Sequence, residues 1–233
     1  MRIFSKNHWL IKKWNSEVGI KNIEIIFFDV DGTLLDSSED IVDSVNFTLN
    51  FLGLEEKPFE EIVEYMGPGV KYLIEKSLGE ENESLLDKAL GIFEEYFNKH
   101  SNDKTKLYPN VKEILEYLKD KENFILTNRR KKMAEITLRK FGILKYFKEV
   151  IGGDEDDCLK PSPCPLHKAL KYFEEKKDKS IIVGDMAVDI KTGKNAGIVT
   201  CGVTYGVGKK KDITKARPDY IIDDIIELKE IIR

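Results

Sequence analysis

Six short runs rich in isoleucine, valine and phenylalanine recur along the chain, at residues 25–28, 124–126, 150–151, 181–183, 198–203 and 220–222. Polar residues do not alternate regularly within these runs, which is typical of strands buried on both faces. Helical patterns lie between most of them, at residues 111–120, 131–141, 165–176 and 187–195. Strand followed by helix, repeated, predicts an α/β fold: a Rossmann-like parallel sheet with helices on both faces.

The alternation stops between residues 37 and 106, where apolar residues follow a helical spacing and no strand pattern occurs. Ile41, Val45 and Leu49 fall on one helical face, and a Gly67-Pro68-Gly69 turn interrupts the segment. We therefore expect a helical cap domain at 37–106, inserted into an α/β core domain made of residues 23–36 and 107–233.

Residues 1–22 form a separate, basic segment, with five lysines or arginines against one glutamate. Leu10, Ile11, Trp14 and Val18 would form one apolar stripe if this segment were a helix. Such a basic amphipathic extension can lie on a membrane or a partner, but packing on its own domain or on a second subunit is favoured.

Polar side chains follow three of the predicted strands at the point where each strand ends. They are Asp29 and Asp31, then Thr127 and Asn128, then Asp185 with Asp189. Lys160, in a Lys-Pro-Ser-Pro stretch, precedes a predicted helix. Because ligands bind at the carboxyl ends of parallel strands, we expect these groups to share one edge of the sheet.

Four neighbouring carboxylates cannot all stay ionised in a buried site without a cation. A set of oxygen ligands suits Mg²⁺, and Mn²⁺ also favours it. Thr127 and Lys160 supply a hydroxyl and an ammonium group, which a phosphate group needs. Gly32 can take a positive φ, so the Asp31-Gly32-Thr33 loop can present backbone N–H groups to an anion.

The order of these groups resembles the four motifs of the haloacid dehalogenase superfamily. The matching residues are Asp29-Val30-Asp31-Gly32-Thr33, Thr127, Lys160, and Gly184-Asp185 with Asp189. The resemblance covers residues 23–233, and the helical insert corresponds to one type of cap domain in that superfamily. The Gly67-Pro68-Gly69 turn in the cap resembles a turn of the phosphoglycolate phosphatase branch, and a plain connection between two helices is the alternative interpretation of it.

The resemblance implies a role for each residue. Asp29 would attack phosphorus and form an aspartyl phosphate, while Asp31 would protonate the leaving oxygen and later activate water. Thr127 and Lys160 would hold the transferring phosphoryl oxygens. The metal ligands would be Asp29, the backbone carbonyl of Asp31, Asp185, and Asp189, the last of these through water or by orienting Lys160.

Further residues are expected to line the substrate site. Gly32, Thr33 and Asn128 belong to the phosphate-binding loops, and Gly69 in the cap turn would let the backbone approach the substrate. Arg129 either binds a substrate carboxylate or is a solvated residue at a helix N-terminus, and the sequence slightly favours the second interpretation.

The predicted function is a Mg²⁺-dependent phosphatase of small phosphomonoesters, with phosphoglycolate as the first candidate substrate. The alternatives are a sugar phosphomutase or a pyrophosphate or nucleotide phosphohydrolase of the same superfamily. The arginine usual in a phosphomutase cap is missing, because residues 37–106 contain none. A regulatory binding protein on the same fold is the non-enzymatic alternative, but a pure binder needs no second aspartate for proton transfer.

Composition indicates the kind of partner and the cellular location to expect. The formal net charge of −4 gives no electrostatic reason to expect a nucleic acid partner. No apolar run has the roughly 18 residues that a membrane helix needs. The three cysteines, Cys158, Cys164 and Cys201, form no CxxC pair, so reduced thiols are expected. These features predict a cytoplasmic protein, monomeric or homodimeric.

Overall fold

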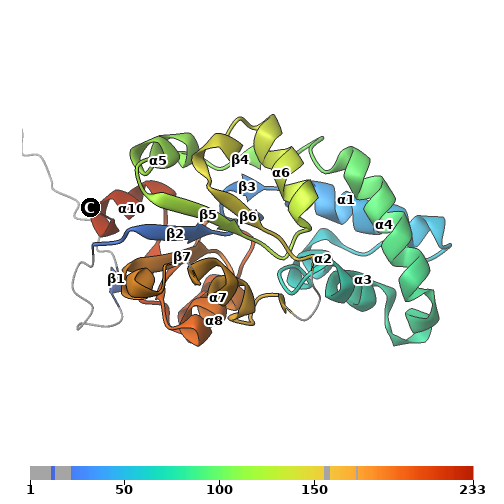
Figure 1. Cartoon of the computed structure of the whole chain (residues 1–233). Coiled ribbons are helices and arrows are strands. Elements are labelled where there is room, and N and C mark those ends of the chain that lie inside the picture. The colour runs from blue at the N-terminus through green and yellow to red at the C-terminus, as the bar shows by residue number, and fades with distance from the viewer. Residues whose placement is uncertain (1–11, 14–21, 155–157, 172, 233) are drawn as a thin grey trace, which may run out of the picture.

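The structure, a computed structural model, describes residues 12–13, 22–154, 158–171 and 173–232 (Figure 1). Its centre is a seven-stranded sheet in the order β1-β9-β8-β7-β2-β5-β6, in which β1 is antiparallel to β9 and all other neighbouring strands are parallel. The strands are β1 (Lys12–Lys13), β2 (Ile25–Phe28), β5 (Glu122–Leu126), β6 (Glu149–Ile151), β7 (Ser180–Gly184), β8 (Val199–Val203) and β9 (Tyr220–Ile222). The expected parallel α/β sheet is thus confirmed.

Helices cover both faces of this sheet. They are α5 (Val111–Tyr117), α6 (Lys131–Lys140), α7 (Cys164–Leu170), α8 (Ala187–Ala196), α9 (Lys210–Ala216) and α10 (Leu228–Ile231). The predicted helix at 165–176 is shorter in the structure, because α7 ends at Leu170 and a separate 3₁₀ helix spans Glu174–Lys179. The sequence patterns did not predict α9 or α10.

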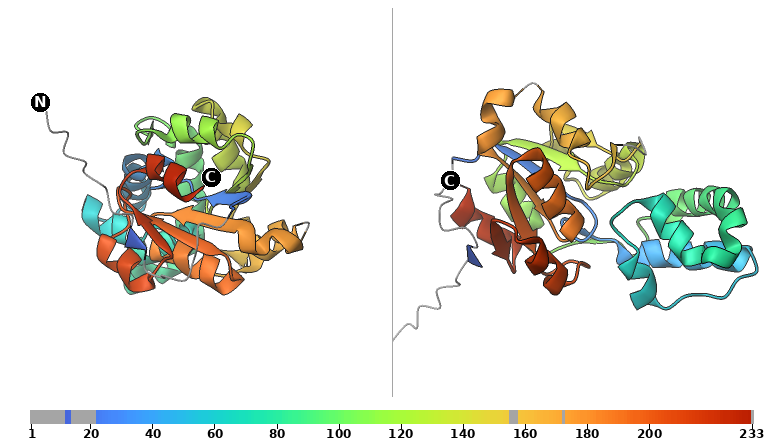
Figure 2. Two further views of the ribbon diagram at one scale, coloured as in Figure 1. Left: turned by 90° about the vertical axis from the view of Figure 1, so that its left-hand side faces the viewer. Right: turned by 90° about the horizontal axis from the view of Figure 1, so that it is seen from below.

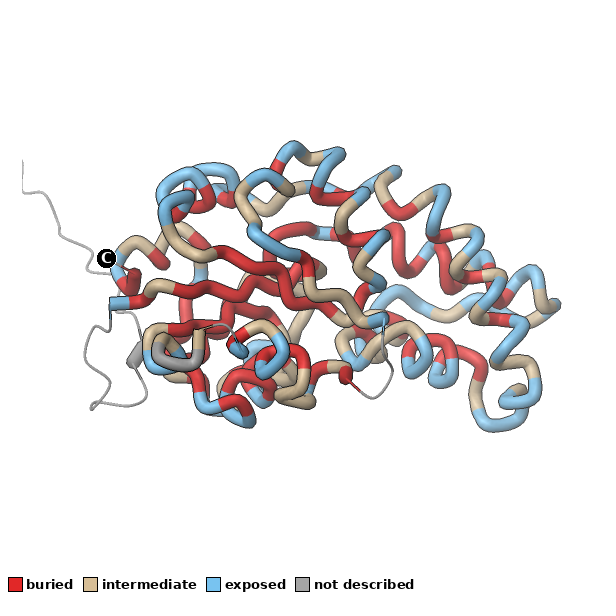
Figure 3. Tube along the Cα trace, in the orientation of Figure 1, coloured by how far each residue is buried: buried red, intermediate tan, exposed pale blue. Residues whose placement is uncertain are grey.

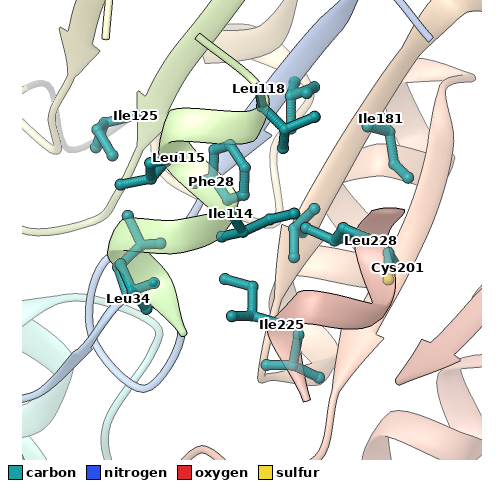
Figure 4. Packing of buried hydrophobic residues seen from close by; sticks show 14 of the residues in the cluster. Phe28, Leu34, Ile114, Leu115, Leu118, Ile125, Ile181, Cys201, Ile225 and Leu228 are labelled. Carbon is teal, nitrogen blue, oxygen red and sulfur yellow. The ribbon is translucent and has the colours of Figure 1, made fainter. Parts of the chain in front are cut away.

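Successive residues of β2 point to opposite faces of the sheet, as the two-residue period of a strand requires. Ile26 and Phe28 belong to the core that α5, α6 and α10 cover, and Figure 4 shows Phe28 among its neighbours there. Ile25 and Phe27 belong to the opposite core, beneath α7 and α8. All four side chains are fully buried, and the strands form the buried centre of the molecule (Figure 3). This double burial explains why the run is continuously apolar.

The inserted segment forms a helical lobe beside the carboxyl ends of the central strands (Figure 2). It contains α1 (Ser38–Phe51), α2 (Phe59–Glu64), α3 (Val70–Leu78), a 3₁₀ helix η1 (Glu80–Leu85) and α4 (Leu86–His100). Their apolar faces pack into a second hydrophobic core, which includes Val45, Leu49, Ile74 and Phe93 of the lobe and also Met133 of α6. We call this lobe, residues 37–106, the cap.

The two connections to the cap run side by side. β3 (Leu35–Asp36) pairs antiparallel with β4 (Lys106–Leu107). The buried carboxylate of Asp40, at the start of α1, accepts hydrogen bonds from the backbone N–H groups of Lys104 and Thr105, both at 2.9 Å. The chain therefore leaves the core and returns to it at one place.

Two expectations about the chain need correction. Lys12 and Lys13 do not continue a helix, because they pair as β1 with Ile221 and Tyr220 of β9; the rest of the helix expected within residues 1–22 lies outside the described residues, apart from Asn22. Cys158 and Cys164 are not reduced thiols: they form a disulfide with Cα atoms 5.3 Å apart, and Cys201 is free and buried. Within the described residues, no helix combines the length and apolar character needed to cross a membrane.

Candidate active site

The carboxyl ends of three adjacent strands, β5, β2 and β7, bring together most of the predicted groups. Asp29 and Asp31 follow β2, Thr127 to Arg129 follow β5, and Asp185 follows β7. A pocket opens there between core and cap. Its lining from the core side includes Asp29, Asp31, Thr127, Asn128, Arg129 and Lys160, and its lining from the cap includes Ile41, Met66, Gly69, Leu73, Phe93 and Phe97.

Lys160 lies between two carboxylates at the base of this site. Its Nζ atom is 2.8 Å from Oδ1 of Asp29 and 2.6 Å from Oδ1 of Asp189, and all three side chains are buried. Burial lowers the pKa of Lys160, but the negative charges of Asp189 and Asp29 outweigh burial and raise it above its usual value. The side chain is therefore a charged ammonium group, although it is cut off from water.

Asp185 is held by its neighbours. Its Oδ1 accepts a hydrogen bond from the hydroxyl of Thr33 at 3.1 Å, and its Oδ2 accepts one from the backbone N–H of Gly208 at 3.0 Å. Burial, and next the charge of Asp189, raise the pKa of Asp185 to about 7. Gly32 packs so closely that a Cβ atom there would lie 2.2 Å from Oδ2 of Asp185.

Three carboxylates of this group meet the requirements of a divalent cation. One oxygen each from Asp29, Asp185 and Asp189 lies within 4.8 Å of the other two, and all three residues are buried. Burial, opposed by Lys160 but assisted by Asp189 and Asp185, raises the pKa of Asp29 well above its ordinary value. One lysine cannot balance three carboxylates, so the excess negative charge and the oxygen-only ligands fit a divalent cation.

Asp31 makes a different set of contacts. Arg129 donates to it from Nη2 at 2.5 Å and from Nε at 3.1 Å, and the hydroxyl of Ser37 donates to the same carboxylate. The guanidinium also donates from Nη1 to the Thr137 hydroxyl at 3.2 Å, and lies 4.9 Å from the centre of the Phe97 ring in the cap. Arg129 is only 6% exposed, so the interpretation as a solvated helix-end residue is wrong.

The remaining predicted residues hold the loops of the site together. The Asn128 side chain donates to the carbonyl of Gly67 in the cap at 2.8 Å and accepts from the backbone N–H of Lys160 at 2.8 Å. Buried Thr127 accepts a hydrogen bond from the backbone N–H of Arg129 at 3.1 Å. Gly69 has a positive φ of 116° and lines the pocket directly.

Several residues near the site were not predicted from the sequence, namely Ser37, Phe97, Thr137, Tyr205 and Gly208. The hydroxyl of Tyr205 donates to the carbonyl of Thr33 at 2.8 Å, and Gly208 holds Asp185. Both follow β8, the strand next to β7 in the sheet. The end of the apolar run at 198–203 could therefore have indicated that the residues after it lie near the site. No sequence signal marked Phe97 and Thr137 as site residues, because their spacing along predicted helices indicates only packing.

Comparison with known proteins defines the class. The model of the haloacid dehalogenase-like hydrolases matches residues 26–203. The chain is 33% identical over 222 residues to a phosphoglycolate phosphatase of Vibrio parahaemolyticus, covering 91% of this chain and 97% of the relative. An Aquifex aeolicus protein of the same name is 34% identical over 206 residues, covering 86% and 95%. The chain belongs to the haloacid dehalogenase-like hydrolases.

The solved structures agree with this assignment. A predicted phosphoglycolate phosphatase from Haemophilus somnus superposes with a TM-score of 0.84 at 29% identity, covering 91% of this chain and 99% of that one. Within the superfamily, the relatives together with the aspartates and the lysine of the site identify the chain as a phosphatase.

Proposed function

We propose that the chain is a Mg²⁺-dependent phosphatase that hydrolyses phosphoglycolate through an aspartyl-phosphate intermediate. The observation that carries the proposal is the buried ammonium group of Lys160 between Asp29 and Asp189. A phosphoryl group in contact with Asp29 would meet this fixed positive charge in a site with little water, where such a charge is most effective. The names of the relatives support phosphoglycolate as the substrate.

The chemistry follows from the positions of the two aspartates. A carboxylate oxygen of Asp29 attacks phosphorus as the bond to the ester oxygen breaks, and that oxygen takes a proton from Asp31. Asp31, now a carboxylate, then accepts a proton from water as the water attacks phosphorus. The bond between phosphorus and Asp29 breaks, which releases inorganic phosphate and restores Asp29. Lys160 and Thr127 stabilise the charge on the phosphoryl oxygens throughout.

The acidic groups of the site support the metal requirement. Asp29, Asp185 and the backbone carbonyl of Asp31 would hold Mg²⁺, which supplies positive charge to a bound phosphate group and aligns it with Asp29. Asp189 accepts one hydrogen bond from Lys160 and one from the backbone N–H of Met186. We infer that its main task is to position Lys160, with any contact to the metal passing through water.

The test is phosphate release from a panel of phosphoglycolate, glucose phosphates, nucleotides and pyrophosphate, with Mg²⁺, with Mn²⁺ and with a chelator. Phosphoglycolate is expected to give the highest kcat/KM, and Asp29→Asn to lower that value by at least about 1,000-fold. A nucleotide or pyrophosphate preference would point to the phosphohydrolase alternative. Interconversion of sugar phosphates without net phosphate release would point to the phosphomutase.

Location and assembly belong to the proposal as well. We propose that the enzyme acts in the cytoplasm on a small phosphorylated substrate, as a monomer or a homodimer, without a nucleic acid partner. Light scattering on the purified chain measures the assembly directly.

A further inference from the structure

The pocket contains two cationic side chains among its described lining residues, Lys160 and Arg129. Lys160 is engaged by Asp29 and Asp189 at the reacting end of the site. The side chains that the cap contributes there, such as those of Ile41, Leu73 and Phe93, are apolar and cannot bind a charged group. A second anionic group on a substrate would therefore be recognised by Arg129.

Arg129 is held in place from the side that faces away from Asp31. Nη1 donates to Thr137 in α6, and Phe97 of the cap covers the guanidinium at 4.9 Å. These contacts do not need Asp31, so the guanidinium would keep its position if Asp31 moved away. The remaining edge, Nε and Nη2, is the fork that pairs with a carboxylate through two parallel hydrogen bonds.

In this structure the carboxylate on that fork is the one of Asp31. With Ser37 donating as well, the Asp31 carboxylate accepts three hydrogen bonds, which leaves it poorly placed to serve a substrate oxygen. Asp31, the proposed proton-transfer residue, thus occupies the position beside Arg129 that a substrate carboxylate would take. An Asp side chain is itself a carboxylate on a short stem, so one can replace the other without altering the guanidinium.

We propose that Arg129 binds the carboxylate of the substrate, which displaces Asp31. Once released from the arginine, the Asp31 carboxylate takes up a proton from solvent and turns to the ester oxygen, to which it gives that proton as the bond to phosphorus breaks. This inference rests on the proposed function and extends it to a substrate class: phosphomonoesters whose carboxylate is one carbon from the ester oxygen. In such a molecule the ester oxygen and the carboxylate are close neighbours, as Asp31 and Arg129 are here. Phosphomonoesters that lack the carboxylate should therefore be hydrolysed with a low kcat/KM, because they have no group that could replace Asp31 in the ion pair with Arg129.

The test compares phosphoglycolate with ethyl phosphate, an ester of similar size without the carboxylate, in the presence of Mg²⁺. Arg129→Gln is expected to lower the ratio of kcat/KM for phosphoglycolate to that for ethyl phosphate by about 100-fold. Arg129→Lys keeps the charge without the fork and should restore part of the ratio. Arg130→Gln is the matched control, because Arg130 is exposed and pairs with Glu94 of the cap outside the pocket, and it should leave the ratio unchanged.

A merely structural arginine would give another result. If Arg129→Gln lowered kcat/KM for both esters by the same factor, the residue would only position Asp31, and the proposal would be wrong. Calorimetry gives a readout without turnover: phosphoglycolate should bind Asp29→Asn more tightly than Asp29→Asn/Arg129→Gln, and equal affinities would also overturn the proposal. Absence of phosphate release from either ester by the wild type would instead refute the proposed function, while the binding comparison still tests Arg129.

Discussion

The Nζ atom of Lys160 lies 2.8 Å from Asp29 and 2.6 Å from Asp189, so a single buried ammonium group joins the attacking carboxylate to the start of α8. Lys160→Met removes the only charge that neutralises this pair within the described residues of the pocket. We expect kcat to fall about 100- to 1,000-fold, because a preorganised charge at the phosphoryl group is lost. Steady-state kinetics on phosphoglycolate measures the effect.

Lys132→Met is the matched control for this substitution, since Lys132 is an exposed residue of α6 away from the pocket. Its kcat should equal that of the wild type. A Lys160→Met enzyme with normal kcat and a raised KM would show that the lysine binds substrate uniformly and does not stabilise the transition state.

The pKa of Asp185, raised to about 7 by burial, predicts how stability depends on pH without metal. The unfolded chain releases this proton near pH 4, so the folded state binds more protons between about pH 4 and about pH 7. Stability of the metal-free protein therefore falls as pH rises through this window, by up to about 4 kcal/mol. At pH values above this window, a bound divalent cation offsets the free-energy cost of burying the ionised Asp185.

Thermal unfolding with a chelator or with Mg²⁺ checks this expectation. The increase in Tm on adding Mg²⁺ should grow from about pH 5 to about pH 8, since the cation competes with the proton for Asp185. Asp185→Asn should abolish most of the increase. An increase that is the same at every pH would mean that Asp185 is already ionised in the metal-free protein.

The disulfide between Cys158 and Cys164 encloses the loop that carries Lys160. Closing so short a loop lowers the entropy of the unfolded chain and is worth about 2 kcal/mol. A reductant should therefore lower the Tm of the wild type but not that of Cys164→Ser. Equal responses of the two proteins to the reductant would show that no such bond contributes, and peptide mapping without reductant detects the bond itself.

Gly32 has a φ of +84°, and a Cβ atom there would come within 2.2 Å of Asp185. Gly32→Ala should therefore displace Asp185 and weaken Mg²⁺ binding, in addition to a backbone cost of about 1–2 kcal/mol. Gly142→Ala is the matched control: its φ is +72°, but no atom lies within 4 Å of the added Cβ. Both variants should lose stability in urea unfolding, whereas calorimetry should detect weaker Mg²⁺ binding only for Gly32→Ala.

The sheet could be predicted because burial on both faces makes β2 and β7 continuously apolar, which leaves a clear trace in sequence. The meeting of Asp29, Lys160 and Asp185 was likewise expected, since parallel strands bring their carboxyl ends to one edge. The helices α9 and α10 were not predicted, because each is short and has few buried residues to produce a periodic pattern. Short elements depend on tertiary contacts more than on local pattern.

Contacts between distant parts of the chain could not be predicted. The ion pair of Asp31 and Arg129 spans 98 positions, and Thr137 and Phe97 complete it from two helices whose patterns report only apolar packing. The disulfide was missed for another reason: the spacing of Cys158 and Cys164 has no motif, and whether two thiols meet depends on the path of the loop between them.

The antiparallel pairing of β3 with β4 places both ends of the cap next to each other. The 70-residue cap is therefore inserted between two neighbouring points of the core. A helical lobe of another shape, inserted between the same two strands, would therefore alter which molecules the pocket accepts, while Asp29, Lys160 and Asp189, which all belong to the core, would keep their mutual contacts.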